Sequence, residues 1–462
     1  MSTPSIVWFR QDLRLHDQAA LLAAANEGPF VPVYILDDET PGERKLGGAQ
    51  RWWLHHSLAQ LKTALPALVL RRGACVSELA RLAAELGTKR IHAIRHYEPW
   101  WQDAESELGA DFDLVLHDGN HLARPETILT GGGTRYKVFT PWWRALLERM
   151  PPAKPLPVPD ITNGVTGIAS DDLGDWVLLP TSPDWSTGFS DWAPGEEGAR
   201  AALKTFLPRL KVYDAARNLP SVEGVSRLSP HLHFGEISPA TVWHIAAREA
   251  GKAAEPFLRE VGWRDYATNL IDQFPDYPQR NGKSAYDRFP WRSGEAADRD
   301  FTAWTKGRTG YPIVDAGMRE LWATGFMHNR VRMIAASFLI KHLLIDWRRG
   351  ERWFWDTLLD ADYAANGSNW QWVAGTGVDA PMFSRIMAPL SQSEKFDAGA
   401  YVRKWVPELA DLRDPYVHDP DEFGVRPRAY PPKLIGHRAA RERALEAMQL
   451  TRAGDWSAAD GE

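Results

Sequence analysis

Residues 360–372 combine residue types that a surface loop or a plain core element does not need together. They read DADYAANGSNWQW, with carboxylates at Asp360 and Asp362, a polar turn around Asn366, and indoles at Trp370 and Trp372. Carboxylates and amides hydrogen-bond polar groups, whereas indoles bury large apolar area and stack on flat rings. The segment therefore indicates one site at which a ligand meets acids, an amide and two indoles.

A second segment, residues 224–239, reads GVSRLSPHLHFGEISP. Ser226 and Ser229 bracket Arg227, and Pro230 is suited to the first turn of a helix. Hydroxyls, a guanidinium and the backbone N–H groups of a helix start can cradle a phosphate. The same residues also fit a plain helix cap, so both interpretations stay open.

Two pairs of side chains complete the candidate chemistry. Glu260 and Trp263 are three residues apart in LREVGWRDY, on one face of an expected helix, and could hold a flat base with polar edges. A surface glutamate over a core tryptophan is the alternative. Arg332 and Asp360 are candidates for a buried ion pair, which could equally be structural.

The N-terminal part alternates strand and helix patterns. Helical patterns end at Gly28 and Gly87, where C-cap glycines belong. This alternation predicts a doubly wound parallel sheet. No GxGxxG follows the first strand, so the common dinucleotide fingerprint is missing, but a ligand could still sit at the switch point outside the strand ends, near Arg10, Asp37 and Asp38. The expected strands are residues 5–9, 30–37, 89–97 and 113–119, and the expected helices are residues 18–28, 49–65 and 75–87.

The rest of the chain differs from the N-terminal part in composition and in the spacing of its apolar residues. We expect an α/β domain over residues 1–130, an interdomain linker over 131–198 containing the proline-rich MPPAKPLPVPD, an all-helical domain over 199–450, and a polar tail over 451–462. From residue 199 onward only helical spacing is convincing. The fold class is thus an α/β domain plus an all-α domain joined by a long linker.

Composition narrows the class of protein. The chain has 462 residues, of which 44% are hydrophobic and 25% charged, as in ordinary globular proteins. The single cysteine, Cys75, rules out an internal disulfide, zinc ribbons and cysteine-ligated iron–sulfur clusters. No metal site is predicted elsewhere in the chain. No apolar run is long enough to span a membrane. The net charge is −6, but residues 319–352 are basic, a weak indication of a phosphate-facing surface, and the 22 tryptophans are an unusual excess.

Together these segments resemble the DNA photolyase/cryptochrome family along nearly the whole chain, and most closely the microbial class I cyclobutane pyrimidine dimer photolyases. The resemblance rests on IVWFRQDLRLHDQAAL, YKVFTPWWRAL, SRLSPHLHFGEISP, EVGWRDYATNLI, GRTGYPIVDAGMRELWATGFMHNRVRMIAASFL, LLIDWRRGERWF, DADYAANGSNWQW and RIMAPLSQSEKFD, in that order.

The resemblance implies an FAD folded into a U in the helical domain. Asn366 would face flavin N5, and Arg332 paired with Asp360 would balance the negative charge of the flavin. Val225 replaces the hydroxyl residue usual at the start of the phosphate loop, so its contact would come from the backbone. The implied FAD contacts are Tyr213, Val225, Ser226, Arg227, Leu228, Ser229, Arg264, Asn329, Arg332, Asp360, Asp362 and Asn366.

The resemblance also implies a lesion pocket and an electron relay. A flipped-out pyrimidine dimer would lie among Glu260, Trp263, Asn329, Met333 and Trp372, with Glu260, Asn329, Asn366 and Met333 as the catalytic set. Arg330 and Arg385 would contact DNA phosphates, and electrons would pass along Trp370, Trp347 and Trp291. Light would drive an electron from reduced FAD to the dimer and back. A folate or deazaflavin antenna would lie along residues 37–58, and the protein would act as a cytoplasmic monomer without a membrane.

Three other functions remain open at this stage. A cryptochrome-type receptor usually carries a long regulatory tail, and here the sequence stops soon after the helical domain. A (6-4) photolyase needs a pair of histidines, whereas MHNRVRM offers only His328. A flavin- or DNA-binding protein without light chemistry would not need the tryptophan relay.

Overall fold

The computed structural model describes the backbone of residues 3–459 and the side chains of residues 3–451. It forms two compact units, each assembled from separate stretches of chain. Unit 1 comprises Met1–Lys211, Ser226–Pro275 and Leu359–Asp362, and unit 2 comprises Val212–Val225, Asp276–Leu358 and Tyr363–Glu462. The contiguous domain bounds expected from the sequence stay a prediction.

Unit 1 contains a five-stranded parallel sheet with the order β3-β2-β1-β4-β5. Apolar runs form its central strands, and Ile6 pairs in register with Val31 on one side and Ile91 on the other. The sequence analysis missed β3, which is short and ends in two arginines. The strands are β1 Ser5–Phe9, β2 Phe30–Leu36, β3 Val69–Arg72, β4 Arg90–Ile94 and β5 Asp113–His117. The doubly wound sheet is therefore confirmed.

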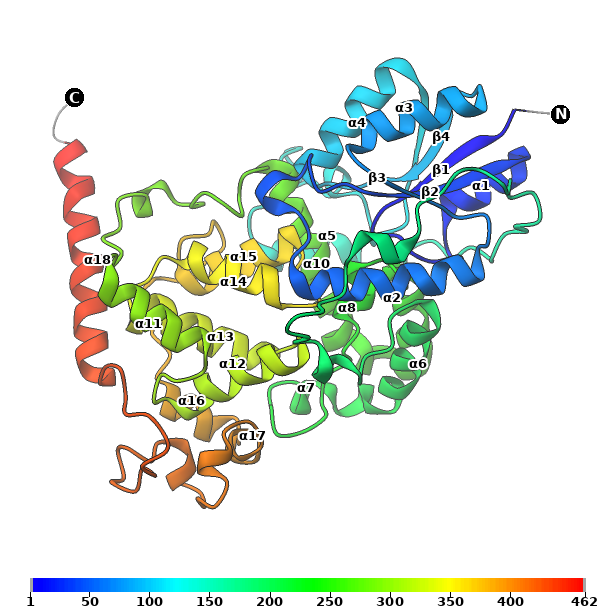
Figure 1. Ribbon diagram of the computed structural model, residues 1–462. Helices are drawn as coiled ribbons and strands as arrows, with labels where there is room; N and C mark the ends of the chain where they lie inside the picture. The colour runs from blue at the N-terminus through cyan, green and yellow to red at the C-terminus, as the bar shows by residue number, and fades with distance from the viewer. Residues whose placement is uncertain (1–2, 460–462) are drawn as a thin grey trace. The chain divides into compact units, whose positions relative to one another are not determined.

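Helices cover both faces of the sheet (Figure 1). Helices α3 (Cys75–Leu86) and α4 (Pro99–Asp111) bury one face around Trp8, Val33 and Leu79, while α1 (Ala19–Glu27) packs on the other. Gly28 and Gly87 are the C-caps of α1 and α3, with φ of 142° and 64°, conformations that favour glycine. Both expected caps are confirmed.

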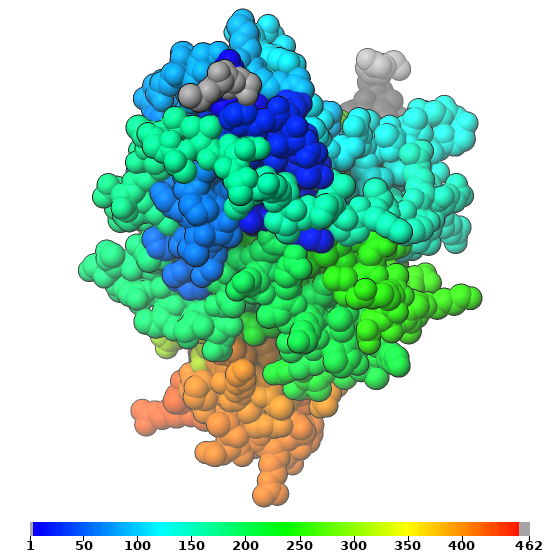
Figure 2. Space-filling model, turned by 90° about the vertical axis from the view of Figure 1, so that its right-hand side faces the viewer, coloured from blue at the N-terminus to red at the C-terminus, as the bar shows by residue number. Residues whose placement is uncertain are grey.

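Further helices complete unit 1. They are α2 Gly48–Ala64, α5 Phe139–Leu147, α6 Glu196–Phe206, α8 Ser229–His233, α9 Pro239–Ala250 and α10 Glu255–Gln273. The proline-rich residues 151–160 form neither helix nor strand, as expected. Beyond them the chain contacts β2 and β3, where Val165 N–H donates to Phe30 O at 2.9 Å and Asp171 N–H to Leu70 O at 2.8 Å. Figure 2 shows this connection as a teal band on the surface.

Unit 2 is helical, and no strand occurs in the described part of the chain beyond His117. Its core contains the indoles of Trp304 and Trp347, both 0% exposed. The helices are α7 Tyr213–Ala216, α11 Glu295–Thr305, α12 Pro312–Thr324, α13 Asn329–Ser337, α14 Trp347–Thr357, α15 Tyr363–Ala374, α16 Pro389–Lys395, α17 Gly399–Trp405 and α18 His437–Ala459, with a π-helix at Phe338–His342. Helix α18 enters the expected polar tail, whose residues 460–462 lie outside the described residues.

None of the helices described here has the length and apolar character needed to cross a membrane.

Candidate functional site

The acid-, amide- and indole-rich segment lies mostly within α15, so the expected polar turn is wrong. Gly367 is accommodated inside this helix because a Cβ at its position would overlap the ring of Pro278. Asn366 and Trp370, four residues apart, lie on one face, while Trp372 lies on another. Trp370 is 3% exposed and Trp372 is partly exposed, so the two indoles have different surroundings, as expected.

The side-chain amide of Asn366 is held in one orientation. Its Nδ2 donates to the backbone O of Glu351 at 3.0 Å and to Oε1 of the same residue at 2.9 Å. Because both partners are acceptors, the positions of N and O in the amide are fixed by the bonds. Asn366 Oδ1 receives no hydrogen bond from the described residues, so the amide offers an acceptor and no donor to a ligand.

Trp370 rests on α14 at Gly350, where a Cβ would overlap the six-membered ring of the indole. Trp347 lies three residues earlier on α14 and is therefore on a neighbouring part of the same helix face. Its Nε1 donates to Asn281 Oδ1 at 3.0 Å. Trp291 is partly exposed beside Phe289, with ring centroids 4.3 Å apart. The three predicted relay residues thus share unit 2 and run from two buried indoles to one that solvent reaches.

Trp370 has a further aromatic neighbour that the sequence analysis did not assign to the relay. The Trp304 centroid lies 6.3 Å from that of Trp370, in an edge-on arrangement. Phe354 lies 5.0 Å away, also edge-on. Trp304 is 0% exposed, so this branch is enclosed by the core.

Helix α13 starts at Asn329 and is capped by His328. The His328 ring accepts a hydrogen bond at Nδ1 from the backbone N–H of Arg330 at 3.2 Å. Burial lowers the pKa of His328 to about 4, and the charges of Arg332 and Arg330 lower it further in the same direction. His328 is therefore neutral at physiological pH and serves as a helix cap, while Asn329 is exposed.

Two predicted DNA-contacting arginines each lie beside a predicted lesion residue. Arg330 donates from Nη2 to Asn218 Oδ1 at 2.6 Å, and its Nη1 lies 3.5 Å from Met333 Sδ. The Arg385 guanidinium carbon is 5.7 Å from the ring centroid of Trp372. The structure therefore pairs Arg330 with Met333 and Arg385 with Trp372, all within unit 2.

Glu260 and Trp263 both lie on α10, one turn apart, as expected. Trp263 stacks on Phe139 of α5, with centroids 3.5 Å apart and planes 8° apart. This contact fixes the plane of the indole. Since α10 belongs to unit 1, its position against Asn329, Met333 and Trp372 of unit 2 stays a prediction.

The expected phosphate cradle begins a short helix, because Pro230 lies in the first turn of α8. Arg227 has a φ of 55°, and its guanidinium carbon lies 3.9 Å from the ring centroid of Trp192. Ser226 Oγ accepts from Leu228 N–H at 3.3 Å. The Leu228 side chain is 1% exposed, so a ligand would meet only its backbone, whereas Ser229 is exposed.

Four other predicted FAD contacts are divided between the units. Tyr213, Val225 and Arg332 belong to unit 2, and Asp360 to unit 1. Arg332 donates from Nε to Met327 O at 2.7 Å. The predicted pair of Arg332 with Asp360 and the contacts of Tyr213 and Val225 therefore stay predictions.

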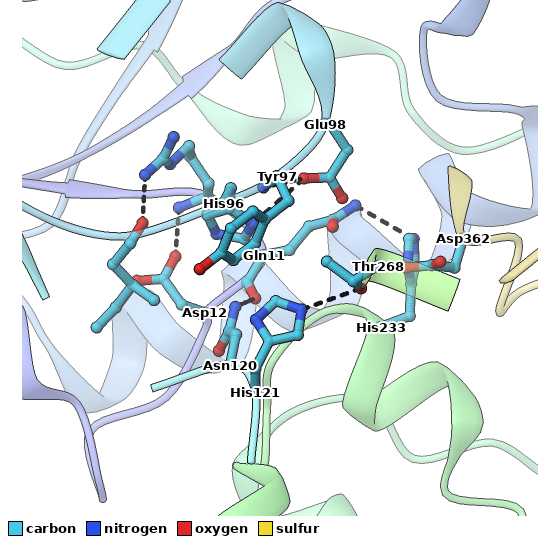
Figure 3. A network of polar contacts seen from close by, with 12 residues as sticks. Gln11, Asp12, His96, Tyr97, Glu98, Asn120, His121, His233, Thr268 and Asp362 are labelled. Carbon is cyan, nitrogen blue, oxygen red and sulfur yellow. Dashed lines mark hydrogen bonds and ion pairs between the residues drawn. The ribbon is translucent and has the colours of Figure 1, made fainter. Parts of the chain in front are cut away.

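The carboxyl ends of the strands in unit 1 carry a polar network (Figure 3). Gln11 follows β1, Glu98 follows β4 and Asn120 follows β5. Gln11 Nε2 lies 3.3 Å from His233 Nε2, and His233 Nδ1 lies 3.7 Å from Asp362 Oδ2. In a sheet of this order, ligands usually enter between β1 and β4, where the strand order reverses. Here residues of α8 and the Leu359–Asp362 segment occupy that position.

The three residues expected near a ligand at this edge have internal partners instead. Arg10 is 4% exposed, and its Nη1 forms an ion pair with Glu105 Oε1 at 2.8 Å. Asp37 Oδ2 accepts from Cys75 N–H at 2.8 Å. Asp38 pairs with Arg51. The expectation of a ligand beside these side chains therefore has no support from their contacts.

Within the expected antenna segment, residues 37–58, the two tryptophans of α2 are part of the packing. Trp53 is 0% exposed and donates from Nε1 to Glu236 Oε1 at 2.9 Å. Trp52 is edge-on to Phe189, with centroids 5.3 Å apart. These contacts give the indoles structural roles, and the antenna stays a prediction.

Glu98 and Asp362 are electrostatically linked acids. Burial raises the pKa of Glu98 to about 7, and the negative charge of Asp362 acts in the same direction. Predicted FAD contact Asp362 is thus joined to β4 through Glu98 and to α8 through His233. Any change in the charge of one carboxyl changes the energy of the other.

Polar atoms of the predicted FAD contacts Arg264 and Asn366, and of Ser368, which the sequence analysis did not assign, fit a polar cofactor. Arg264 donates from Nη1 to Asn120 O, but its buried Nε has no hydrogen-bond partner among the described residues. Ser368 Oγ, next to Gly367 on α15, is likewise buried without one. In unit 2 the acceptor of Asn366 and the hydroxyl of Ser368 suit a ligand with both donors and acceptors, and in unit 1 the Nε of Arg264 suits a ligand acceptor.

Sequence reasoning missed four residues of this arrangement. Glu351 and Gly350 lie in RRGERW, which has only the signal of a basic, solvated helix, yet Glu351 is 0% exposed. Glu98 and His233 lie in segments that gave no ligand motif of their own. Only the tertiary contacts reveal the roles of these four residues.

Comparison with known proteins identifies the family. Residues 5–160 match the family model for DNA photolyase, and residues 257–450 match that for the FAD binding domain of DNA photolyase. The deoxyribodipyrimidine photo-lyase of Agrobacterium fabrum is 46% identical over 96% of this chain and 98% of its own. Cryptochrome-2 of Arabidopsis thaliana is 35% identical over 91% of this chain and 73% of its own.

A solved structure has the same fold. The bacterial class III photolyase from Agrobacterium tumefaciens superposes with a TM-score of 0.91, at 45% identity and over 98% of both chains. The chain described here belongs to the DNA photolyase/cryptochrome family. The expected family, fold class, FAD cofactor and enzyme class, deoxyribodipyrimidine photo-lyase, are confirmed. The expected class I subclass differs from the class III of this neighbour and stays a prediction.

Proposed function

We propose that this chain repairs cyclobutane pyrimidine dimers in DNA with blue light. The observation that carries the proposal is the fixed amide of Asn366, which presents an acceptor to the ligand while its Nδ2 donates two hydrogen bonds to Glu351. Bound reduced FAD would supply a photo-excited electron that is returned after the reaction. Splitting a cyclobutane ring breaks two C–C bonds and needs no net proton transfer, so the site requires no proton donor here.

The cap histidine supports this choice of lesion. A (6-4) lesion needs a proton donor in the pocket. The histidine next in sequence to the predicted lesion residue Asn329 is His328. Because its pKa is lowered to about 4 and its Nδ1 accepts the α13 cap bond, His328 is neutral and structurally engaged. Position 366 carries an asparagine and not a proton-donating acid, which favours repair over cryptochrome-type signalling.

The remaining side chains have binding roles in this proposal. Trp263 and Trp372 form apolar walls for the extruded dimer, and Glu260 and Asn329 hydrogen-bond its polar edges. Arg330 and Arg385 contact phosphates of the backbone. Met333 fills the pocket beside Arg330.

The FAD-binding roles follow the expected contacts. Ser226, Arg227, Ser229 and the backbone of Val225 and Leu228 hold phosphates at the start of α8. Asp362 and Arg264 hydrogen-bond polar edges of the cofactor. The other proposed contacts are Tyr213, Arg332, Asp360 and Asn366.

Trp370, Trp347 and Trp291 carry electrons from the surface to the cofactor site in this proposal. Their support is the contact of Trp370 with α14 at Gly350 and the partial exposure of Trp291. We further infer a folate or deazaflavin antenna. We also infer that the protein acts in the cytoplasm as a monomer, and size-exclusion chromatography with light scattering checks the oligomeric state.

A repair assay tests the proposal. The reduced protein is mixed with oligothymidine that contains cyclobutane dimers, illuminated with blue light, and followed by the return of thymine absorbance. Illuminated protein should restore the absorbance, and a dark sample should not. Recovery only on a (6-4) substrate, or on neither substrate, would overturn the proposal.

A further inference from the structure

Residues 375–388 link α15 to α16 without forming a helix or strand. This stretch carries Arg385, whose guanidinium lies beside Trp372. A loop of this length in a compact unit must satisfy its backbone polar groups in another way. Its contacts therefore decide where Arg385 is presented.

Side chains of unit 2 anchor this loop at three points. Val378 N–H donates to Tyr277 Oη at 3.0 Å. Lys283 Nζ donates to Ala380 O at 3.0 Å, and Lys341 Nζ donates to Arg385 O at 2.8 Å. The two ammonium groups thus hold the backbone of the loop near its middle and at Arg385 itself.

Lys341 is an unusual residue for its position. It lies in the π-helix Phe338–His342 and is 2% exposed, with Nζ 5.4 Å from the ring centroid of Phe383. Burial lowers its pKa to about 7, and the charge of Arg385 lowers it further. π-helical turns inside helices are rare and occur often at functional sites. An apolar side chain would be cheaper to bury here than an ammonium.

Lys283 acts on the same loop from another segment. It follows Gly282, whose N–H donates to Gln371 Oε1 of α15 at 2.8 Å. Lys283 N–H donates to Thr376 O at 2.8 Å, so both its backbone and its side chain hold the loop. Burial also lowers the pKa of Lys283.

We propose that Lys341 and Lys283 are positioning residues that hold residues 375–388 so that Arg385 meets a DNA phosphate beside Trp372. This inference rests on the proposed function, which assigns DNA contacts to Arg385 and Trp372. Preformed placement removes the cost of ordering an exposed arginine and its loop when DNA binds. This pair of lysines, the clamp, therefore contributes to DNA affinity without touching the DNA.

The test measures binding of a dimer-containing duplex and its salt dependence. Lys341→Met and Lys283→Met remove the charge and keep a long apolar chain, and Lys306→Met makes the same change at an exposed position of unit 2 as a control. Lys341→Met should weaken binding about tenfold and lower the salt slope by about 0.9, the value for one phosphate. Lys306→Met should change neither.

A double-mutant cycle shows whether Lys341 acts through Arg385. In the Arg385→Ala background, Lys341→Met should produce no further loss of affinity. Full additivity, or an Arg385→Ala variant that binds as tightly as the wild type, would overturn the proposal.

Hydrogen exchange provides a readout independent of DNA. Amides of residues 375–388 should exchange faster in Lys341→Met and Lys283→Met, with unchanged FAD content. Unchanged exchange in both variants would overturn the clamp, whereas dimer repair by the wild-type protein would still stand. Faster exchange in the two variants, combined with a wild-type protein that repairs no dimers, would instead retain the loop anchors and reject the proposed function, and with it the role of Arg385.

Discussion

Asn366 on α15 donates two hydrogen bonds from Nδ2 to Glu351 on α14, at 3.0 Å to the backbone O and 2.9 Å to the carboxylate. The same two helices also meet one turn further along α15, where Trp370 packs on Gly350 of α14. One interface between two helices therefore fixes both the amide at the proposed flavin position and the first indole of the proposed relay.

Asn366→Asp tests the orientation of this amide. The new carboxyl would face the acceptors of Glu351, so it must bind a proton to keep either bond. We expect the unfolding free energy at pH 8 to fall by about 2 kcal/mol and the yield of dimer repair to fall. Denaturant unfolding and the repair assay measure the two effects.

The matched control is Asn369→Asp, which makes the same change at an exposed position of α15. It should leave stability and repair near the wild-type values. Equal behaviour of the two variants would mean that the contact with Glu351 does not tune the site.

Gly350→Ala tests the close approach of Trp370 to α14. The added Cβ would overlap the indole, so we expect a loss of about 2 kcal/mol in unfolding free energy through overpacking. Light-driven reduction of oxidised FAD should also slow. Gly109→Ala, in α4 with open space around its Cβ, should instead stabilise by up to about 1 kcal/mol. A Gly350 variant as stable as this control would refute the packing argument.

Trp347→Phe separates electron supply from repair. We expect the variant to lose most photoreduction of oxidised FAD, because phenylalanine is harder to oxidise than tryptophan, and to repair dimers normally once chemically reduced. Transient absorption and the repair assay measure these properties. Trp304→Phe is the comparison, since Trp304 also lies beside Trp370. Loss of photoreduction in Trp304→Phe alone would place the relay in that branch.

Glu98→Gln tests the buried acid pair. The pKa of Glu98 is raised to about 7 by burial and by Asp362, so the folded protein holds a proton that the unfolded chain releases. The charged form costs stability, and this cost grows as pH rises from the ordinary glutamate pKa to about 7. We expect Glu98→Gln to match the wild type at pH 4.5 and to exceed it by up to about 3 kcal/mol at pH 8. A constant difference across this range would contradict the shift.

The sheet was predictable because its central strands are apolar runs bounded by glycine-capped helices. β3 was missed because Val69–Arg72 is a short outer strand with two charged residues. Asn366 and Gly367 suggested a turn, since neither favours a helix interior. Glu351 and Pro278 supply the contacts that override this preference, and both are distant in sequence from α15.

Site residues showed the same division. The shared face of Glu260 and Trp263 on α10 was predictable from helical spacing alone, whereas their site roles stay a prediction. Glu351 and Lys341 were not, because a charged residue in a helical pattern indicates a solvated face until burial is known. Both are buried, at 0% and 2% exposure. Family resemblance supplied the FAD and lesion roles, which spacing did not specify.

The most direct test compares two duplexes that differ only in their lesion, a cyclobutane dimer or a (6-4) photoproduct. The reduced holoprotein is illuminated with blue light, and intact thymines are counted by chromatography. The account predicts restored thymines from the cyclobutane dimer and none from the (6-4) photoproduct. Repair of the (6-4) photoproduct, or no light-dependent repair of the cyclobutane dimer, would contradict it.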